Sequence, residues 1–86
     1  MSSRSELLYL GHMLDYARRA HAKAAAVTRS EFFANEDIQV VVTHFIQLVG
    51  EAARRIPPEL CAVHPEIDWQ MIAALEKFTP PEPPSV

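Results

Sequence analysis

The sequence predicts an all-α protein, a helical bundle built on two long antiparallel helices. Three observations support this fold class. Apolar residues recur at helical spacing over two long segments, near residues 5–26 and 36–56. Residues that cap helices stand before these segments, and prolines follow the second one. No run shows the alternation of apolar and polar residues that is typical of a half-buried strand, so a bundle is the expected packing.

The first long helix is predicted from about Ser5 to Ala26. Ser3 and Glu6 have the spacing of a capping box, which marks a helix start. Gly11 is a weak point inside this helix because glycine has a low helix propensity. Apolar or small residues and one histidine form a stripe at helical period: Leu7, Leu10, Leu14, Ala17, His21 and Ala24.

A short helical turn is predicted next. Thr28 and Glu31 repeat the capping spacing, and the turn would carry Phe32 and Phe33 inward.

The second long helix is predicted to begin at Asn35, because two acidic residues follow this good N-cap and complement the helix dipole. Arg54 and Arg55 occupy its last turn, where cations are favoured, and Pro57–Pro58 stop it. Its apolar stripe consists of Ile38, Val41, Val42, Phe45, Leu48, Val49, Ala52 and Ile56.

Shorter elements are predicted in the rest of the chain. The prolines between residues 57 and 65 allow only a short turn, and Asp68 is expected to cap a third helix. Residues of that helix expected to face the core are Trp69, Ile72, Ala73 and Leu75. Four prolines after residue 79 exclude further helix. We therefore expect a helical domain over residues 1–78 and a disordered Pro-rich tail over residues 79–86.

Composition favours a small cytoplasmic globular protein. The chain has 86 residues, 49% of them hydrophobic and 22% charged, which fits one globular domain. No apolar run is long enough to span a bilayer, and no secretion signal is evident, so no membrane is expected as a partner. The single cysteine, Cys61, excludes an internal disulfide and suits a reducing compartment. The net charge of −3 means that any contact with nucleic acid needs a local basic patch.

Two long amphipathic helices and one short one rarely enclose a core. An apolar face is therefore expected to stay exposed, and such faces usually meet a partner. Self-association follows as an expectation from the physics of the bundle.

The four histidines do not predict a metal site. His12, His21, His44 and His64 form no ligand pair at metal-binding spacing, and Cys61 with His64 lacks a second half. Packing or surface roles are favoured for them. Four basic residues could form a strip for the RNA backbone: Arg18, Arg19, Lys23 and Arg29. This is a weak possibility, because the same charges can balance neighbouring acidic residues on a solvated face.

Three segments stand out in order along the chain: "YLGHMLDYARRA", "EFFANEDIQVVVTHFIQLVGEAARRIPPEL" and "HPEIDWQMIA". Together they resemble the HepT-like family of small HEPN domains, the toxin halves of bacterial HepT/MNT toxin–antitoxin modules. The resemblance runs from about Glu6 to Leu75, and "LVGEAARRIPPEL" followed by "IDW" is its most specific part.

The resemblance implies a metal-independent ribonuclease without a cofactor that works as a homodimer. Its active site would be an arginine, four to six residues, a histidine and then a tyrosine. The arginine would neutralise a scissile phosphate, and the histidine would move the proton of the ribose 2′-hydroxyl. The resemblance also implies a partner, an MNT-type nucleotidyltransferase antitoxin that adds AMP to the tyrosine.

The implied catalytic motif is absent from this sequence. Alignment on Trp69 and Ile72 places Glu76 at the family arginine, Pro81 at the histidine and Pro83 at the tyrosine. Neither arginine nor histidine follows His64. The change to Pro-rich sequence after Leu75 leads us to expect that the chain is truncated or divergent there and that the final family helices are missing.

A remnant of a polar site on the second long helix is the other possibility, and it would consist of Glu51, Arg54, Arg55 and His44. Glu51, Arg54 and Arg55 lie at i, i+3 and i+4, and the Gly-Glu-Ala segment packs near the active site in the resembling family. The alternative is a solvated ion pair that stabilises the helix by ~0.2–0.5 kcal/mol. This alternative is favoured.

Three functional hypotheses remain open. The favoured one is a catalytically degenerate HepT-like protein of a type VII-like toxin–antitoxin module. The second is an active ribonuclease whose site is rebuilt from His44, Arg54 and Arg55 across a dimer interface. The third is a helical dimerisation or adaptor module unrelated to RNA.

Overall fold

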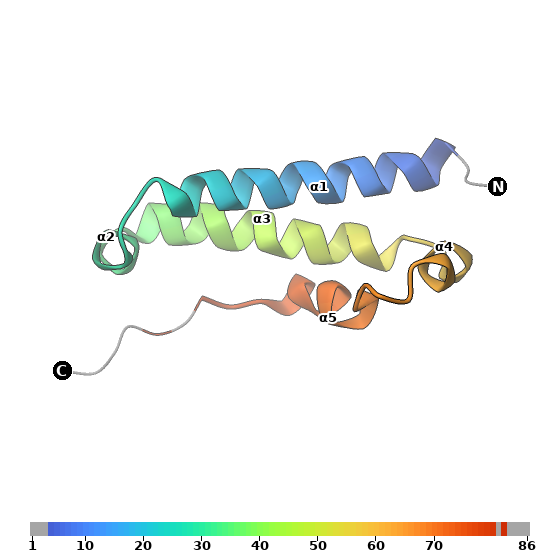
Figure 1. Cartoon of the computed structure of the whole chain (residues 1–86). Coiled ribbons are helices and arrows are strands. Elements are labelled where there is room, and N and C mark those ends of the chain that lie inside the picture. The colour runs from blue at the N-terminus through green and yellow to red at the C-terminus, as the bar shows by residue number, and fades with distance from the viewer. Residues whose placement is uncertain (1–3, 81, 83–86) are drawn as a thin grey trace.

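The computed structural model of the chain describes residues 4–80 and 82. Two long antiparallel helices lie side by side, α1 (Arg4–Ala25) and α3 (Glu36–Arg54), as Figure 1 shows. The short helix α2 (Arg29–Ala34) connects them at one end of the molecule. At the other end α4 (Pro58–Val63) turns the chain, so that α5 (Trp69–Ala74) and the 3-10 turn η1 (Leu75–Lys77) return along α3. The all-α prediction with two long antiparallel helices is confirmed.

The helix starts follow the predicted capping chemistry. Thr28 and Glu31 form a complete capping box at α2, in which the Thr28 hydroxyl accepts from the Glu31 N–H at 3.1 Å. The Asn35 side chain accepts from the N–H of Ile38 at 3.1 Å and starts α3. Asp68 caps α5 in the same way, through the N–H of Met71. The predicted cap of the first helix involves Ser3, which lies outside the described residues.

The core is formed on α3 and is made mainly of small side chains. All predicted apolar residues of this helix are buried or half-buried. The buried hydrophobic residues are Ala20, Val42, Val49, Ala52, Ala53 and Ile56. No large side chain among the described residues is completely enclosed. The bundle therefore has little interior of its own, as expected for a chain of this length.

The apolar stripe predicted on the first helix does not face α3. Leu7 is 60% exposed and Leu14 is 50% exposed. Instead, Tyr16 stacks on Phe45 of α3 with ring centroids 6.3 Å apart, and Ala20 is buried. Helix α1 carries apolar side chains on two neighbouring sides, and periodicity alone does not say which side packs. The second side is the exposed apolar face that the bundle was expected to leave.

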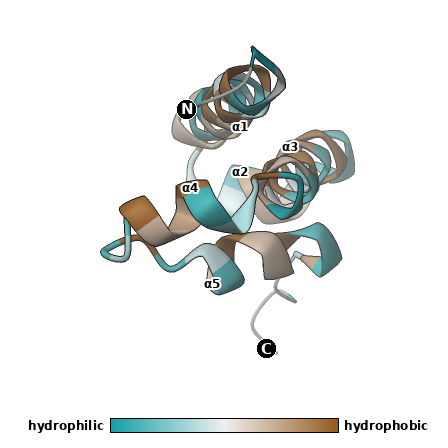
Figure 2. Ribbon diagram, turned by 90° about the vertical axis from the view of Figure 1, so that its right-hand side faces the viewer, coloured by the Kyte–Doolittle hydropathy of each residue, from teal (hydrophilic) through white to brown (hydrophobic). Residues whose placement is uncertain are grey.

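Helix α3 is the common neighbour of α1 and of the α5–η1 segment. Seen along the long axis (Figure 2), α1 and α5 lie apart from each other, and α3 lies beside both. After η1 the chain is extended, and the Gln47 amide donates to the carbonyl oxygen of Phe78 at 2.9 Å. Residues 79, 80 and 82 are not helical. The remaining tail positions, Pro81 and 83–86, lie outside the described residues, so disorder there stays a prediction.

Candidate functional site

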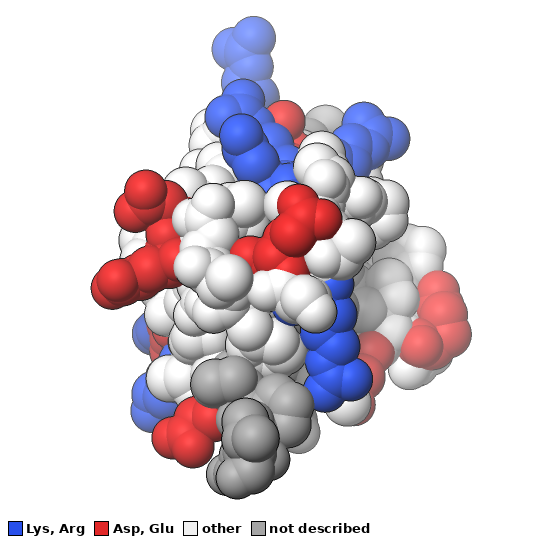
Figure 3. All heavy atoms as spheres, turned by 90° about the vertical axis from the view of Figure 1, so that its left-hand side faces the viewer, with Lys and Arg blue, Asp and Glu red and all other residues white. Residues whose placement is uncertain are grey.

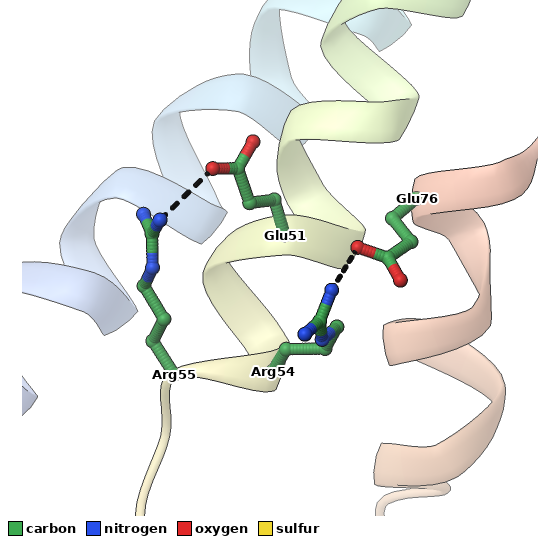
Figure 4. Close-up of polar contacts among 4 residues, drawn as sticks. All are labelled: Glu51, Arg54, Arg55 and Glu76. Carbon is green, nitrogen blue, oxygen red and sulfur yellow. Dashed lines mark hydrogen bonds and ion pairs between the residues drawn. The ribbon is translucent and has the colours of Figure 1, made fainter.

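The last turn of α3 carries three of the four residues predicted as a polar site. Successive residues of an α-helix are separated by ~100° around its axis, so neighbours in sequence point to different sides. Figure 4 shows the result: Glu51 and Arg55 form an ion pair on the α1 side, and Arg54 reaches across to Glu76 on η1. The predicted remnant is therefore divided between two sides of one helix.

Arg54 and Glu76 form the closer of these two pairs. A guanidinium nitrogen of Arg54 lies 2.5 Å from a carboxylate oxygen of Glu76, and the side chains are 59% and 26% exposed. Glu76 is the residue predicted from the sequence to stand at the family arginine. Where the resemblance implies a free cation, this chain has an acidic group that neutralises the cation beside it.

Gly50 allows the α5–η1 segment to come this close to α3. A Cβ added at Gly50 would lie 2.7 Å from the carbonyl carbon of Leu75 and nearer still to the backbone nitrogen of Glu76. Both atoms belong to backbone and cannot rotate away as a side chain would. Glycine is the residue type that leaves room for this backbone contact, and the contact positions Glu76 opposite Arg54.

The Glu51–Arg55 pair borders a cleft between α1 and α3. The two charged groups lie 3.1 Å apart at i,i+4 spacing, and the side chains are 47% and 56% exposed. The guanidinium of Arg55 also lies 6.0 Å from the ring centroid of Tyr9. The cleft has a volume of about 110 Å³ and is lined by Tyr9, His12, Tyr16, Leu48, Glu51, Ala52 and Arg55.

His44, the fourth predicted residue, lies elsewhere on α3. It is exposed, contacts the ring of Phe45 with centroids 5.9 Å apart, and borders a separate hollow that Gln47 and Pro80 also line. Ten residues separate it from Arg54, which corresponds to ~15 Å along a helix. One copy of the chain therefore does not bring His44 to the arginines. A site shared between two copies stays a hypothesis.

Sequence reasoning missed the aromatic half of the cleft. Tyr9, His12 and Tyr16 lie on one side of α1, at i, i+3 and i+7, and this spacing was the available signal. It was overlooked because the neighbouring leucine stripe is more apolar. The partner of Arg54 was also missed, since no local pattern links two residues that α4 and α5 separate in the sequence.

His64 and Cys61, which were considered as metal ligands on the basis of the sequence, have local contacts instead. His64 Nδ1 lies 3.0 Å from the Glu66 carboxylate. The pKa of this carboxyl is lowered below its usual 4.5, mainly by a hydrogen bond from the backbone N–H of Glu66 and secondly by the hydrogen bond with His64. Cys61 is half-buried, with its sulfur 3.9 Å from the carbonyl oxygen of Ile56. Among the described residues, no three His, Cys, Asp or Glu side chains gather as metal ligands would.

The predicted basic strip does not form one positive surface. Arg19 pairs with Asp15 at 3.0 Å, and Arg29 lies over the ring of Phe33. On the face drawn in Figure 3, several basic groups gather at the top, and acidic groups lie directly below and beside them. Within the described part of the chain, no helix combines the length and apolarity that crossing a bilayer requires.

The chain was compared with solved structures and with models of protein families. No solved structure matches the chain. The model of a protein family described as "Ribonuclease HepT-like" matches residues 13–78. This range covers most of the chain and includes Gly50, both ion pairs and Glu76. The chain belongs to the HepT-like ribonuclease family.

Proposed function

We propose that this HepT-like protein is part of a type VII-like toxin–antitoxin module in the cytoplasm and acts by binding its partners, without cleaving RNA at the family's motif. The observation that carries the proposal is the Arg54–Glu76 ion pair. Cleavage requires a cation against the scissile phosphate and a group that moves a proton. A carboxylate at the arginine position repels phosphate and also neutralises the nearest arginine.

Two partners are proposed. The first is a second copy of the chain, which would cover the apolar side of α1 that contains Leu7 and Leu14. The second is an MNT-type nucleotidyltransferase antitoxin. Because Pro83 stands at the tyrosine position, AMP cannot be transferred to the chain there, and this partner would act by binding alone.

The first experiment measures cleavage of a mixed single-stranded RNA by the purified chain, with EDTA present to silence contaminating metal-dependent nucleases. We expect no cleavage by the natural chain, because it lacks both groups of the motif. Cleavage that the His44→Ala variant abolishes would overturn the proposal and support a site rebuilt between two copies.

A gain-of-function variant tests the same reasoning from the other side. The double substitution Glu76→Arg with Pro81→His restores an arginine and a histidine at the shortest family spacing. We expect RNA cleavage by this variant and none by Glu76→Arg alone, which is the matched control without the proton-moving group. Co-purification with a nucleotidyltransferase encoded beside the chain tests the partner, and failure to form a complex would favour an unrelated adaptor role.

A further inference from the structure

The cleft between α1 and α3 gathers chemistry that the ion pair at η1 does not use. Tyr9 and Tyr16 are half-buried there, and His12 is exposed at its edge. On the α3 side it is bordered by the carboxylate of Glu51 and the guanidinium of Arg55. Two phenol rings, an imidazole, a carboxylate and a guanidinium thus line one opening of about 110 Å³.

The antiparallel register arranges these groups in order along the cleft. Arg55 lies over Tyr9 at one end, and Tyr16 stacks on Phe45 toward the other end. The ring of His12 is 6.0 Å from that of Tyr16, centroid to centroid. Tyr9 and Tyr16 are seven residues apart, or ~10 Å along α1. The two tyrosines are thus too far apart for one planar ring to cover both, and a ring at the level where Glu51 faces α1 (Figure 4) meets one of them.

The carboxylate of Glu51 favours a ring that presents two N–H donors side by side. An ionised carboxylate only accepts, and its two oxygens offer about four acceptor positions, of which the pair with Arg55 uses one oxygen. Among the RNA bases, guanine presents two adjacent donors, N1–H and N2–H, on its Watson–Crick edge. Adenine and cytosine each place an acceptor nitrogen beside their amino group, and uracil flanks its single N–H with oxygens. Those acceptors would face the carboxylate and repel it.

Arg55 and the aromatic rings complete such a site. The guanidinium has five N–H donors, so pairing with Glu51 leaves donors for a phosphate oxygen. Aromatic rings supply a face on which a base of any type can stack. An opening of about 110 Å³ is close to the size of one base, so the base would lie in the cleft and the phosphate at its rim beside Arg55.

We propose that the α1–α3 cleft binds the base of a guanine nucleotide, either free or as an unpaired residue of RNA, with the base against one of the two tyrosines, its Watson–Crick edge on Glu51 and its phosphate at the rim beside Arg55. This site goes beyond the proposed function. It needs no cleavage and no antitoxin, so it stands or fails separately from the toxin–antitoxin role.

The test measures the affinity of the purified full chain for GMP, AMP, CMP and UMP. Calorimetry gives the dissociation constants, and NMR detects the change at the His12 ring. In parallel, fluorescence anisotropy measures the binding of labelled single-stranded oligonucleotides that carry G, A, C or U at one position and are otherwise identical. We expect guanine to bind at least about tenfold more tightly than the other bases, the usual discrimination of a two-bond base contact. Tighter binding of the oligonucleotide than of GMP identifies RNA as the source of the nucleotide, and the reverse identifies a free nucleotide.

Two variants assign the contacts. Glu51→Gln replaces one acceptor by a donor at the same size, and it should abolish the preference for guanine. Arg55→Gln should weaken the binding of all four nucleotides to the same extent, because it removes the contact to the phosphate that they share. Asp15→Asn is the control, since it removes the same charge from another i,i+4 ion pair that does not line the cleft. Circular dichroism verifies that each variant keeps its helical content, which is expected because these side chains are largely exposed.

Three results would overturn the proposal. The first is equal binding of all four nucleotides, and the second is a guanine preference that survives Glu51→Gln. The third is the absence of any saturable change at the His12 ring with GMP or with the guanine-containing RNA. A basic peptide that binds the cleft where nucleotides do not would assign Glu51 to a protein partner instead.

Discussion

Gly50 is the residue on which the geometry of the α3 end depends. It lies in the middle of the C-terminal half of α3, where a glycine weakens the helix relative to alanine. Its backbone contact with Leu75 and Glu76 compensates for that loss by bringing η1 against α3. The Arg54–Glu76 ion pair exists because this contact does.

The Gly50→Ala substitution should therefore destabilise the protein, although alanine is the better helix former. The added methyl group overlaps backbone atoms, and we expect a loss of about 1–3 kcal/mol in the free energy of unfolding, the usual cost of overpacking. Urea unfolding followed by circular dichroism measures it.

Gly11→Ala is the matched control, because nothing lies within 4 Å of a Cβ at Gly11. This substitution should raise the free energy of unfolding by about 0.5–1 kcal/mol through helix propensity alone. Equal effects of the two substitutions would contradict the close approach of η1 to α3.

At this scale the sequence alone could identify Glu51, Arg54 and Arg55 as a polar group, since their spacing is local. It could not identify the partner of each. Arg54 and Glu76 are separated by 22 residues and meet only because α4 reverses the chain. The cleft that joins Tyr9 to Arg55 depends in the same way on the register between two helices.

Among the elements, α3 follows its sequence most closely. A strong cap starts it, two prolines stop it, and its single apolar stripe leaves one possible buried side. Helix α1 was predicted in extent but not in orientation. Its leucines and its tyrosines occupy neighbouring sides, and the packing of Tyr16 on Phe45 decides between them.

The Asn35 cap gives a prediction for the junction of α2 and α3. Asn35→Ala removes the acceptor for the Ile38 N–H and should lower the free energy of unfolding by about 1 kcal/mol. Asn35→Asp keeps an oxygen at the same place and should leave stability nearly unchanged. Thermal unfolding of both variants provides the check, and a similar loss in both would show that the cap contributes little.

At the scale of the whole molecule, the exposed side of α1 predicts the state of association. Charges placed there by the double substitution Leu7→Glu with Leu14→Glu should convert the proposed homodimer to a monomer, because a charged group loses its hydration in an apolar interface. Sedimentation velocity distinguishes the two states.

Val63→Glu introduces the same charge at another exposed apolar position, on α4, and should leave the dimer intact. A natural chain that sediments as a monomer at every concentration, or a dimer that tolerates both α1 charges, would exclude this face as the interface.

The position of α3 between its neighbours also has a dynamic consequence. The α5–η1 segment covers a short stretch of α3 that contains Gly50, Arg54 and Gln47, whereas α1 packs along much of the length of α3. Proteins open in cooperative units whose stability follows their packing. The α5–η1 segment can therefore detach as one unit while the α1–α3 pair stays closed, and its amides should exchange with solvent earlier than those of α3. Each such opening would free Arg54 from Glu76 for a moment, so the arginine would lose its neutralising partner on a timescale set by local unfolding.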